Sequence, residues 1–354
     1  MRRRQVLKAG GAAIAAPVLA QLARPLDAWA KTEQIVVMTW GGQWGDAMRD
    51  NVDAAFTKAT GIKVVQDRGA SPAQRITKLK VSAGNPVADV FQLADGLVPL
   101  AIRQGVAEKI NRDSQRMPNL RNMIPTFWND YWVPQIYSVI GIVYNTHLVK
   151  TAPTSWADLW RPEFKDRIVL PDISHSIGPD IIPIGAVAAG KAPMDEEAGF
   201  EMLKRMTGQR PIWAKDTDTM MNAMRTGDAM IGILYKSQTY TVKGWGAPVE
   251  WVYPKEGGIP YTSGTCIAKG TKNLDAAEEY INVTMDPEVQ TFAAKIYNYG
   301  GTNKETVSHL SPELQERVRF PQDQLDHLIK LDYGLMTDRR GAWVERWNRV
   351  VAGG

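Results

Sequence analysis

Cysteine is nearly absent from this sequence, because Cys266 is the only one in 354 residues. A single thiol cannot form an internal disulfide, so the stability of the fold has to come from the burial of apolar side chains. The shortage also excludes metal sites built from clustered cysteines. The histidines lie far apart, with no HxH or HxxxH pair, so we expect neither a zinc site nor another cofactor. They are His147, His175, His309 and His327.

Long apolar runs are also missing beyond residue 30, where no segment reaches the roughly 20 apolar residues that a membrane-spanning helix needs. Charge of one sign is not in excess there either. The whole chain has a net charge of +4, but residues 1–30 hold five Lys and Arg against one Asp, so the remainder is neutral. We therefore do not expect nucleic acid as a partner, because phosphate contacts require clustered Lys and Arg.

Residues 1–30 have the pattern of an export signal. A basic start over residues 2–8 precedes a weakly apolar stretch, and Ala28 and Ala30 offer small residues at the two positions that signal peptidase reads. We expect cleavage near Ala30 and a periplasmic protein. A membrane anchor is the alternative, which the shortness of the apolar stretch disfavours.

The sequence indicates export more clearly than it indicates which export machinery is used. Arg3 and Arg4 match the paired arginines of the twin-arginine signal, whereas Arg2 and Val6 depart from the residues usual beside them. The twin-arginine machinery is the favoured partner, and the Sec machinery stays open.

Short strand patterns alternate with helical spacing over the rest of the chain. This alternation predicts an α/β protein with a parallel sheet and helices on both faces, long enough for two lobes. The expected strands are 34–39, 62–65, 89–93, 141–144, 167–170, 229–234, 248–253 and 265–268. The expected helices are 46–61, 71–84, 97–104, 196–206, 217–225, 274–285, 287–295 and 332–351.

The residues that follow the predicted strands are aromatic and polar. These segments are 40–45, 94–96, 172–176 and 235–237. In open α/β sheets ligands bind beyond the carboxyl ends of the strands, so these segments are expected to hold a small polar molecule.

Several segments resemble the spermidine/putrescine-binding proteins of ABC importers. They are SWADLWRPEFK (155–165), YPKEGG (253–258), AAEEYINVTMDPEV (276–289) and TGIKV (60–64), and the resemblance extends over the whole chain beyond the signal. It implies an α/β, two-lobed type II periplasmic-binding-protein fold with a hinge and an inter-lobe cleft. It also implies a monomeric solute carrier with an ABC permease as its partner and no enzymatic activity.

The resemblance further implies how the chain is divided between the lobes. Residues 31–138 and 262–305 would form lobe 1, and residues 139–261 and 306–354 would form lobe 2. The chain would cross between the lobes near 137–141 and 260–264, and the last helix would pack on lobe 2.

Carried over residue by residue, the resemblance implies a binding site with aromatic walls. These are Trp40, with Gln43 or Trp44 beside it, Tyr235 and Tyr261. The carboxylates of the polyamine binders are replaced here. Ile173, Ser176 and Ser263 stand where the family has acids, and Asp95 and Asp332 are the acids that could partly compensate for them.

We therefore expect a small organic acid or a zwitterion as the ligand, because buried ammonium groups need carboxylates. Ser174, His175 and Ser176 follow a predicted strand, where a helix start would offer N–H groups to an anion. Lys236 would add a positive charge, and Gly41–Gly42 would form a similar helix start in the other lobe. A true polyamine binder is the alternative.

Two further functions fit parts of the sequence less well. A Ser/His hydrolase could use Ser174 or Ser176 with His175, but the chain has no GxSxG, and adjacent side chains rarely meet in catalytic geometry. An iron carrier could use phenolates such as Tyr235 and Tyr240, but such carriers usually have adjacent tyrosines.

Overall fold

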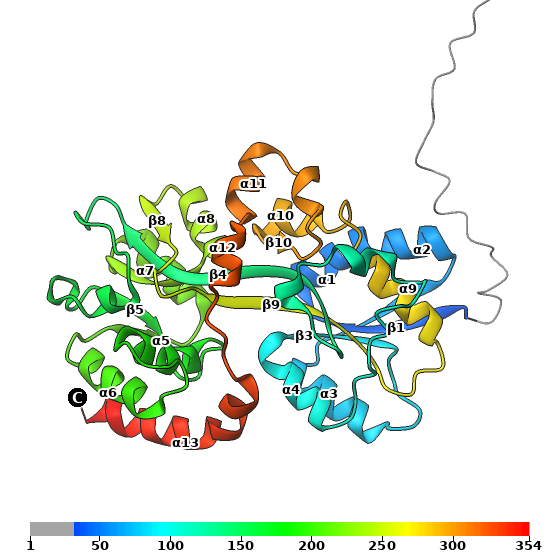
Figure 1. Ribbon diagram of the computed structural model, residues 1–354, viewed down its shortest axis with the longest axis horizontal. Helices are drawn as coiled ribbons and strands as arrows, with labels where there is room; N and C mark the ends of the chain where they lie inside the picture. Colours follow the sequence, from blue (N-terminus) through cyan, green and yellow to red (C-terminus); the bar gives the residue numbers. More distant parts are fainter. Residues whose placement is uncertain (1–31, 354) are drawn as a thin grey trace, which may run out of the picture.

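The computed structural model describes residues 32–353, and it has two lobes joined by two long crossing strands (Figure 1). The crossing strands are β4 (Val133–Asn145) and β9 (Ile259–Ile267), which pair antiparallel with each other. Each strand begins in one lobe and ends in the other, so both lobes share one continuous sheet. Within the described residues its strand order is β2-β1-β3-β9-β4-β7-β5-β6, with β8 and β10 also paired to β4.

The N-terminal half of the chain builds the lobe that lies on the right in Figure 1. Its parallel strands are β1 (Gln34–Thr39), β2 (Lys63–Arg68) and β3 (Val90–Ala94). β1 and β3 are apolar and largely buried, whereas β2 at the sheet edge is partly exposed. Its helices are α1 (Gly42–Met48), the π-helical turn η3 (Arg49–Asp53), α2 (Ala54–Thr60), α3 (Pro72–Val81), α4 (Val98–Arg103) and α9 (Leu274–Thr284).

The other lobe repeats this arrangement. Its strands are β5 (Ile168–Pro171), β6 (Ile212–Ala214), β7 (Ile231–Tyr235) and β8 (Val249–Val252), and β5 pairs parallel with β6 and β7. Its helices are α5 (Ile181–Ala188), α6 (Glu196–Thr207), α7 (Thr217–Thr226) and α8 (Lys236–Gly244). Near the crossing lie α10 (Thr291–Tyr297), β10 (Gly300–Gly301), α11 (Pro312–Val318) and α12 (Gln322–Asp326).

Short 3-10 turns complete the connections. They are η4 (Asp95–Leu97), η5 (Pro118–Asn122), η6 (Pro125–Phe127), η7 (Trp156–Trp160), η8 (Pro162–Phe164), η9 (Gly178–Asp180) and η10 (Thr306–His309).

The predicted α/β class is confirmed, but the prediction of a purely parallel sheet is wrong. β9 runs antiparallel to β3, and β4 runs antiparallel to β7 and β8. The crossing strands are also longer than the predicted strands 141–144 and 265–268. In their other halves Pro134, Pro260 and Gly264 interrupt the apolar pattern, so a pattern of short apolar runs does not reveal the full strands.

The last helix, α13 (Tyr333–Ala352), contacts both lobes. Trp343 packs edge-on against Phe200 of α6, and Arg346 forms two hydrogen bonds of 2.6 Å with Glu197. At its other end Asp338 forms an ion pair with Arg103 of α4. The lobe boundaries predicted from the resemblance stay a prediction.

None of the helices in residues 32–353 combines the length and the apolar character that crossing a bilayer would require. The predicted export signal, its paired arginines and the cleavage near Ala30 lie outside the described residues.

The contact between β9 and β4 leads to a first prediction. A Cβ on Gly264 would lie 2.1 Å from the carbonyl oxygen of Val133 and 2.3 Å from the Cα of Pro134, so Gly264→Ala must push the crossing strands apart. We expect urea denaturation to show a loss of about 1–3 kcal/mol in the free energy of unfolding. Gly244→Ala is the matched control, because no atom lies within 4 Å of a Cβ there. Equal stability of the two variants would contradict the tight crossing.

Candidate functional site

Asp95 lies at the carboxyl end of β3, where the chain turns into η4. One carboxylate oxygen accepts hydrogen bonds from the backbone N–H and the hydroxyl of Thr262, both at 2.9 Å, and the other accepts from the N–H of Gly96. Burial raises the pKa of Asp95 to about 6, although these hydrogen bonds lower it. The site therefore holds a carboxyl group whose charge is costly where it lies.

Asp180 comes from the other lobe, at the end of η9 and directly before α5. It is 5% exposed, and no described residue forms a hydrogen bond or ion pair with its carboxylate. Burial raises the pKa of Asp180 well above its usual value, and the charge of Asp95 raises it further, while the charge of Arg340 lowers it. Two carboxyl groups from opposite lobes thus lie close enough for their charges to interact.

Three tyrosines surround these carboxyl groups. The rings of Tyr235, at the end of β7, and Tyr261, on β9, have centroids 4.7 Å apart. The ring of Tyr333, at the start of α13, lies 3.7 Å from where a Cβ on Gly96 would be. Burial raises the pKa of each tyrosine, and the charge of Asp95 contributes to all three. We call Asp95, Asp180, Tyr235, Tyr261 and Tyr333 the carboxylate–tyrosine cluster.

A row of aromatic rings connects this cluster to Trp40, which follows β1. Successive ring centroids are 5.8, 6.4, 5.5 and 6.2 Å apart, in the order Tyr261, Tyr299, Tyr297, Trp44, Trp40. Trp40 is half-buried, and Trp44 donates to the buried Gln92 side chain at 3.1 Å. The aromatic row therefore joins the end of β1 to the carboxylate–tyrosine cluster.

The segment Ser174–His175–Ser176 is not the first turn of a helix, and this prediction is wrong. It forms a turn before η9, and the α-helix begins only at Ile181. The Asp172 side chain accepts from the N–H and the hydroxyl of Ser174, at 2.9 and 2.6 Å. The backbone N–H of His175 is bonded to the Asp172 carbonyl. These donors are therefore occupied, and Ser174 and Ser176 are exposed.

His175 is buried and holds this turn together. Its Nδ1 accepts from the N–H of Ile177 at 3.1 Å, so the neutral ring carries its proton on Nε2, which lies 3.2 Å from the Thr217 hydroxyl. Burial lowers the pKa of His175, although nearby acids raise it. The Ser174 hydroxyl donates to Asp172, and the Ser176 hydroxyl lies 3.4 Å from Nδ1 of His175, which already accepts from Ile177. The other ring nitrogen contacts the Thr217 hydroxyl, and no described carboxylate is bonded to the ring, so this serine–histidine contact lacks the orienting acid of a hydrolase.

Lys236 lies apart from the cluster, although it follows Tyr235 directly. Adjacent residues at a strand end point to opposite sides. Its ammonium group donates to the carbonyls of Glu316 and Arg319, both at 2.9 Å, and lies over the ring of Phe320. Burial lowers the pKa of Lys236 to about 8. Its charge is thus already solvated by the protein on the far side of the crossing.

The remaining predicted residues are placed as follows. Gln43 is exposed on α1, a helix of seven residues that begins at Gly42. Ser263 is buried on β9, next to Thr262 in the sequence. Asp332 is exposed and caps α13 by accepting from the N–H of Leu335 at 2.8 Å.

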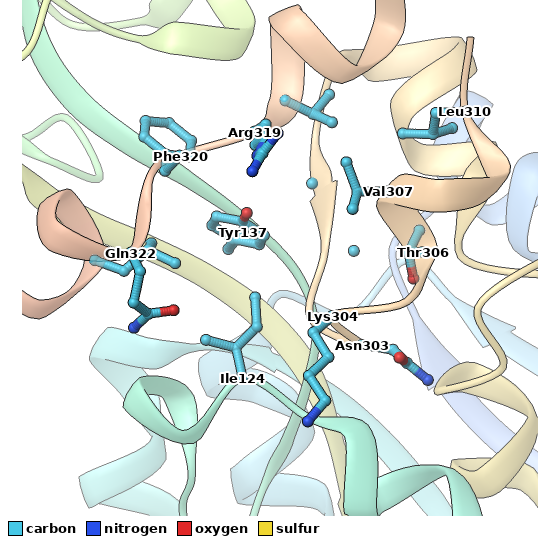
Figure 2. A pocket seen from close by; sticks show the side chains of 14 residues that line it. Ile124, Tyr137, Asn303, Lys304, Thr306, Val307, Leu310, Arg319, Phe320 and Gln322 are labelled. Carbon is cyan, nitrogen blue, oxygen red and sulfur yellow. The ribbon is translucent and has the colours of Figure 1, made fainter. Parts of the chain in front are cut away.

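Two other features attract attention but differ from the cluster. Figure 2 shows a hollow of about 220 Å³ lined by Tyr137, Arg319 and Phe320. Tyr137 precedes Ser138, which pairs with Tyr261, so the hollow lies on the face of β4 opposite to Tyr261.

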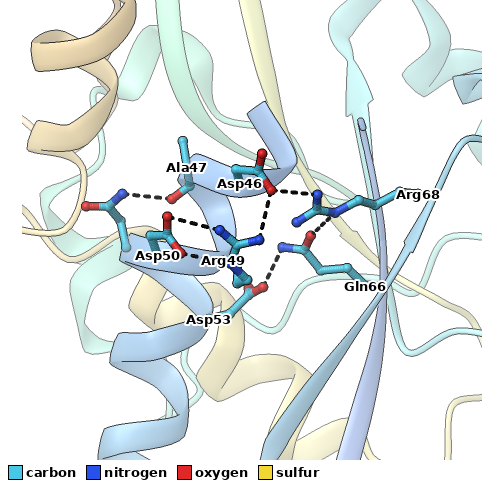
Figure 3. Close-up of polar contacts among 8 residues, drawn as sticks. Asp46, Ala47, Arg49, Asp50, Asp53, Gln66 and Arg68 are labelled. Carbon is cyan, nitrogen blue, oxygen red and sulfur yellow. Dashed lines mark hydrogen bonds and ion pairs between the residues drawn. The ribbon is translucent and has the colours of Figure 1, made fainter. Parts of the chain in front are cut away.

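Figure 3 shows a surface network in which Asp46 accepts from both Arg49 and Arg68, at 2.9 and 2.8 Å. Its opposite charges are matched within the protein, unlike those of Asp95 and Asp180.

The described residues contain no group of three or more His, Cys, Asp or Glu side chains arranged to hold a metal ion.

Sequence reasoning missed Asp180 and Tyr333. Asp180 is the single acid between Ile173 and Ala192 and stands directly before an apolar helix, which was a usable signal of a buried carboxyl group. Tyr333 gave no local signal, because only the return of α13 across the lobes brings it to Gly96.

Comparisons with known proteins agree with this architecture. The profile of the family described as bacterial extracellular solute-binding protein matches residues 51–322. A spermidine/putrescine-binding periplasmic protein of Salmonella typhimurium is 28% identical over 291 residues, which cover 79% of this chain and 82% of the relative. A spermidine/putrescine-binding periplasmic protein 1 of Haemophilus influenzae is 27% identical, with 81% and 80% covered. A crystal structure of an ABC transporter from Clostridium perfringens has a TM-score of 0.79 at 28% identity, covering 90% and 99%.

The lack of a partner for Asp180 leads to a second prediction. A group whose pKa is raised by folding destabilises the folded state above that pKa, and the penalty disappears as the pH falls towards its unfolded value. Asp180→Asn should therefore stabilise the solute-free protein at pH 7.5, by about 1–3 kcal/mol. The gain should shrink as the pH is lowered to 4.5, because protonation removes the charge that burial penalises in the wild type.

Urea denaturation at both pH values measures this effect. Asp332→Asn is the control, because Asp332 is exposed and asparagine also caps helices. A stability gain that is the same at both pH values, or a loss at pH 7.5, would contradict the placement of a strained carboxylate at residue 180.

Proposed function

Because the chain belongs to the family of bacterial extracellular solute-binding proteins, we propose that it captures a small solute between its lobes and delivers it to an ABC permease. Members of this family are transport proteins rather than enzymes, which agrees with the lack of a described carboxylate bonded to the ring of His175. We further propose that residues 1–30 direct export, by the twin-arginine route, and that the mature monomer begins near Ala30 in the periplasm.

The solute that fits the site best carries at least one ammonium group. One observation carries this proposal: Asp180 is buried and Asp95 half-buried, the turns η9 and η4 that carry them both contact α13, and no described residue forms an ion pair with either carboxylate. An ammonium group between them would remove their repulsion and replace the water that each has lost.

This choice revises the sequence-based preference for a small organic acid. That preference assumed that the carboxylates of the polyamine binders are lost, and it did not count Asp180. The donors expected to hold an anion are occupied within the protein, since Ser174 is bonded to Asp172 and Lys236 to two carbonyls. An anion beside Asp95 would instead add a third negative charge.

The tyrosines support the same solute class. The rings of Tyr235 and Tyr261 pack on each other, the ring of Tyr333 lies near Gly96 beside Asp95, and a cation near an aromatic face gains further electrostatic attraction. The Salmonella typhimurium relative, named as a spermidine/putrescine-binding protein, is consistent with an amine as the solute.

Capture would couple binding to movement of the lobes. Asp95 is carried by lobe 1 and Asp180 by lobe 2, for which we propose the boundaries 31–138 with 262–305 and 139–261 with 306–354. A cation that bridges the two carboxylates binds the closed arrangement better than the open one, so it shifts the population towards closure. The closed shape would then be recognised by the permease.

The third prediction tests the amine. In a thermal-shift screen of the protein without residues 1–30, amines and amino acids should raise the melting temperature, whereas dicarboxylates should not. Calorimetry with the strongest ligand should show that Asp95→Asn and Asp180→Asn each weaken binding by about tenfold to a thousandfold, since each removes a charge-assisted contact.

Asp332→Asn is again the matched control and should bind like the wild type. Stabilisation by dicarboxylates alone, or unchanged affinity of Asp180→Asn, would refute the proposed solute class.

A further inference from the structure

We infer that Arg75, beneath Trp40, supplies a positive counter-charge at the other end of the site, so that the solute is a zwitterion rather than a diamine. This inference rests on the proposed function and names the second charge of the solute. Arg75 acts as a specificity-determining residue through its electric field, because the Trp40 ring covers its guanidinium group.

Arg75 is a buried cation without a matching anion. It lies on α3, is 1% exposed, and donates from Nη1 to the carbonyl of Gln92 at 2.6 Å. Its guanidinium carbon lies 4.6 Å from the centroid of the Trp40 ring. Within residues 32–353 its Nε has no hydrogen-bond partner and no carboxylate forms an ion pair with it.

Arg75 nevertheless keeps its positive charge at neutral pH. Burial lowers the pKa of Arg75 to about 10, which leaves the group protonated at neutral pH. Asp67 raises this pKa from a distance, but its own carboxylate is bound to Lys78 at 3.0 Å. A buried positive charge in this state attracts any anion that comes near Trp40.

Arg75 and Asp95 flank the same edge of the sheet. β1 and β3 pair in parallel with Met38 opposite Phe91, which brings Trp40 beside Leu93, two residues before Asp95. Trp40 is the first residue after β1 and Asp95 the first after β3, so both lie at the carboxyl ends of neighbouring parallel strands. The aromatic row connects the same two points.

The site thus has uncompensated charges of opposite sign at its two ends. An ammonium group beside Asp95 and Asp180 and a carboxylate near Trp40 would satisfy both with one small molecule. The second ammonium of a diamine would instead approach the charge of Arg75, which disfavours it, because field effects over such distances are weakly screened inside proteins.

The fourth prediction compares matched ligands. Calorimetry at pH 7.5 and low salt would use ω-amino acids of three to six carbons, and the diamines and monocarboxylates of the same chain lengths. For the best length, we expect the wild-type protein to bind the amino acid at least about tenfold more tightly than the diamine.

Variants of Arg75 then identify the source of this preference. Arg75→Met should reduce the amino acid to diamine ratio to about one or below, and Arg75→Lys should retain most of it because the charge is kept. Arg225→Met, an exposed arginine on α7, should leave the ratio unchanged.

The outcomes separate the two proposals. If a diamine binds the wild-type protein as tightly as the amino acid, or if Arg75→Met keeps the ratio while folded, the inference about Arg75 fails and the ammonium site stands. If none of the amines binds, the proposed function itself fails. If Arg75→Met does not fold, the test uses the ratio of amino acid to diamine affinity in the wild type and in Arg75→Lys. The inference then requires that both proteins prefer the amino acid.

Discussion

Two interacting carboxyl groups without a paired cation are the constraint on which the proposed function depends. Asp95 is fixed by Thr262 and Gly96, so it cannot turn away, and Asp180 is buried with no partner among the described residues. Such an arrangement costs folding free energy. Structures tend to retain such a cost where it serves binding, because the ligand then removes it.

The crossing strands make this arrangement possible. β9 brings Tyr261 and Thr262 to the boundary between the lobes, and β4 lies beside it and pairs with β7, which ends at Tyr235. Because the strands continue through both lobes, a small change in their twist moves Asp180 relative to Asp95. The last helix adds a second connection, since its tryptophans pack on one lobe while Asp338 and Tyr333 contact the other.

Much of the fold could be predicted from the sequence, because apolar periodicity and turn residues act locally. The helix 217–225 ends at Gly227 with a positive φ, as its glycine indicated, and Ser71 caps α3 with Pro72 in its first turn. The mixed sheet could not be predicted in this way, since strand direction depends on pairing between distant segments. The residues of the candidate site could be predicted only in part, for the same reason. Asp95, Tyr235 and Tyr261 were identified from strand ends and resemblance, whereas Tyr333 reaches the site only through tertiary packing.

The unmatched charges also explain why an empty site would resist closure. In the proposed mechanism, separation of the lobes moves Asp95 and Asp180 apart and returns water to them, so the open form would be favoured in the absence of solute. When a cation enters, the repulsion becomes attraction, and the free energy that opposed closure now favours it. The equilibrium between the forms is therefore set by the difference in solute affinity between them, and a solute that fails to match the carboxylates would bind without closing the lobes. A permease that recognises only the closed shape would reject such a complex, so the same two residues would control both affinity and the choice of solute.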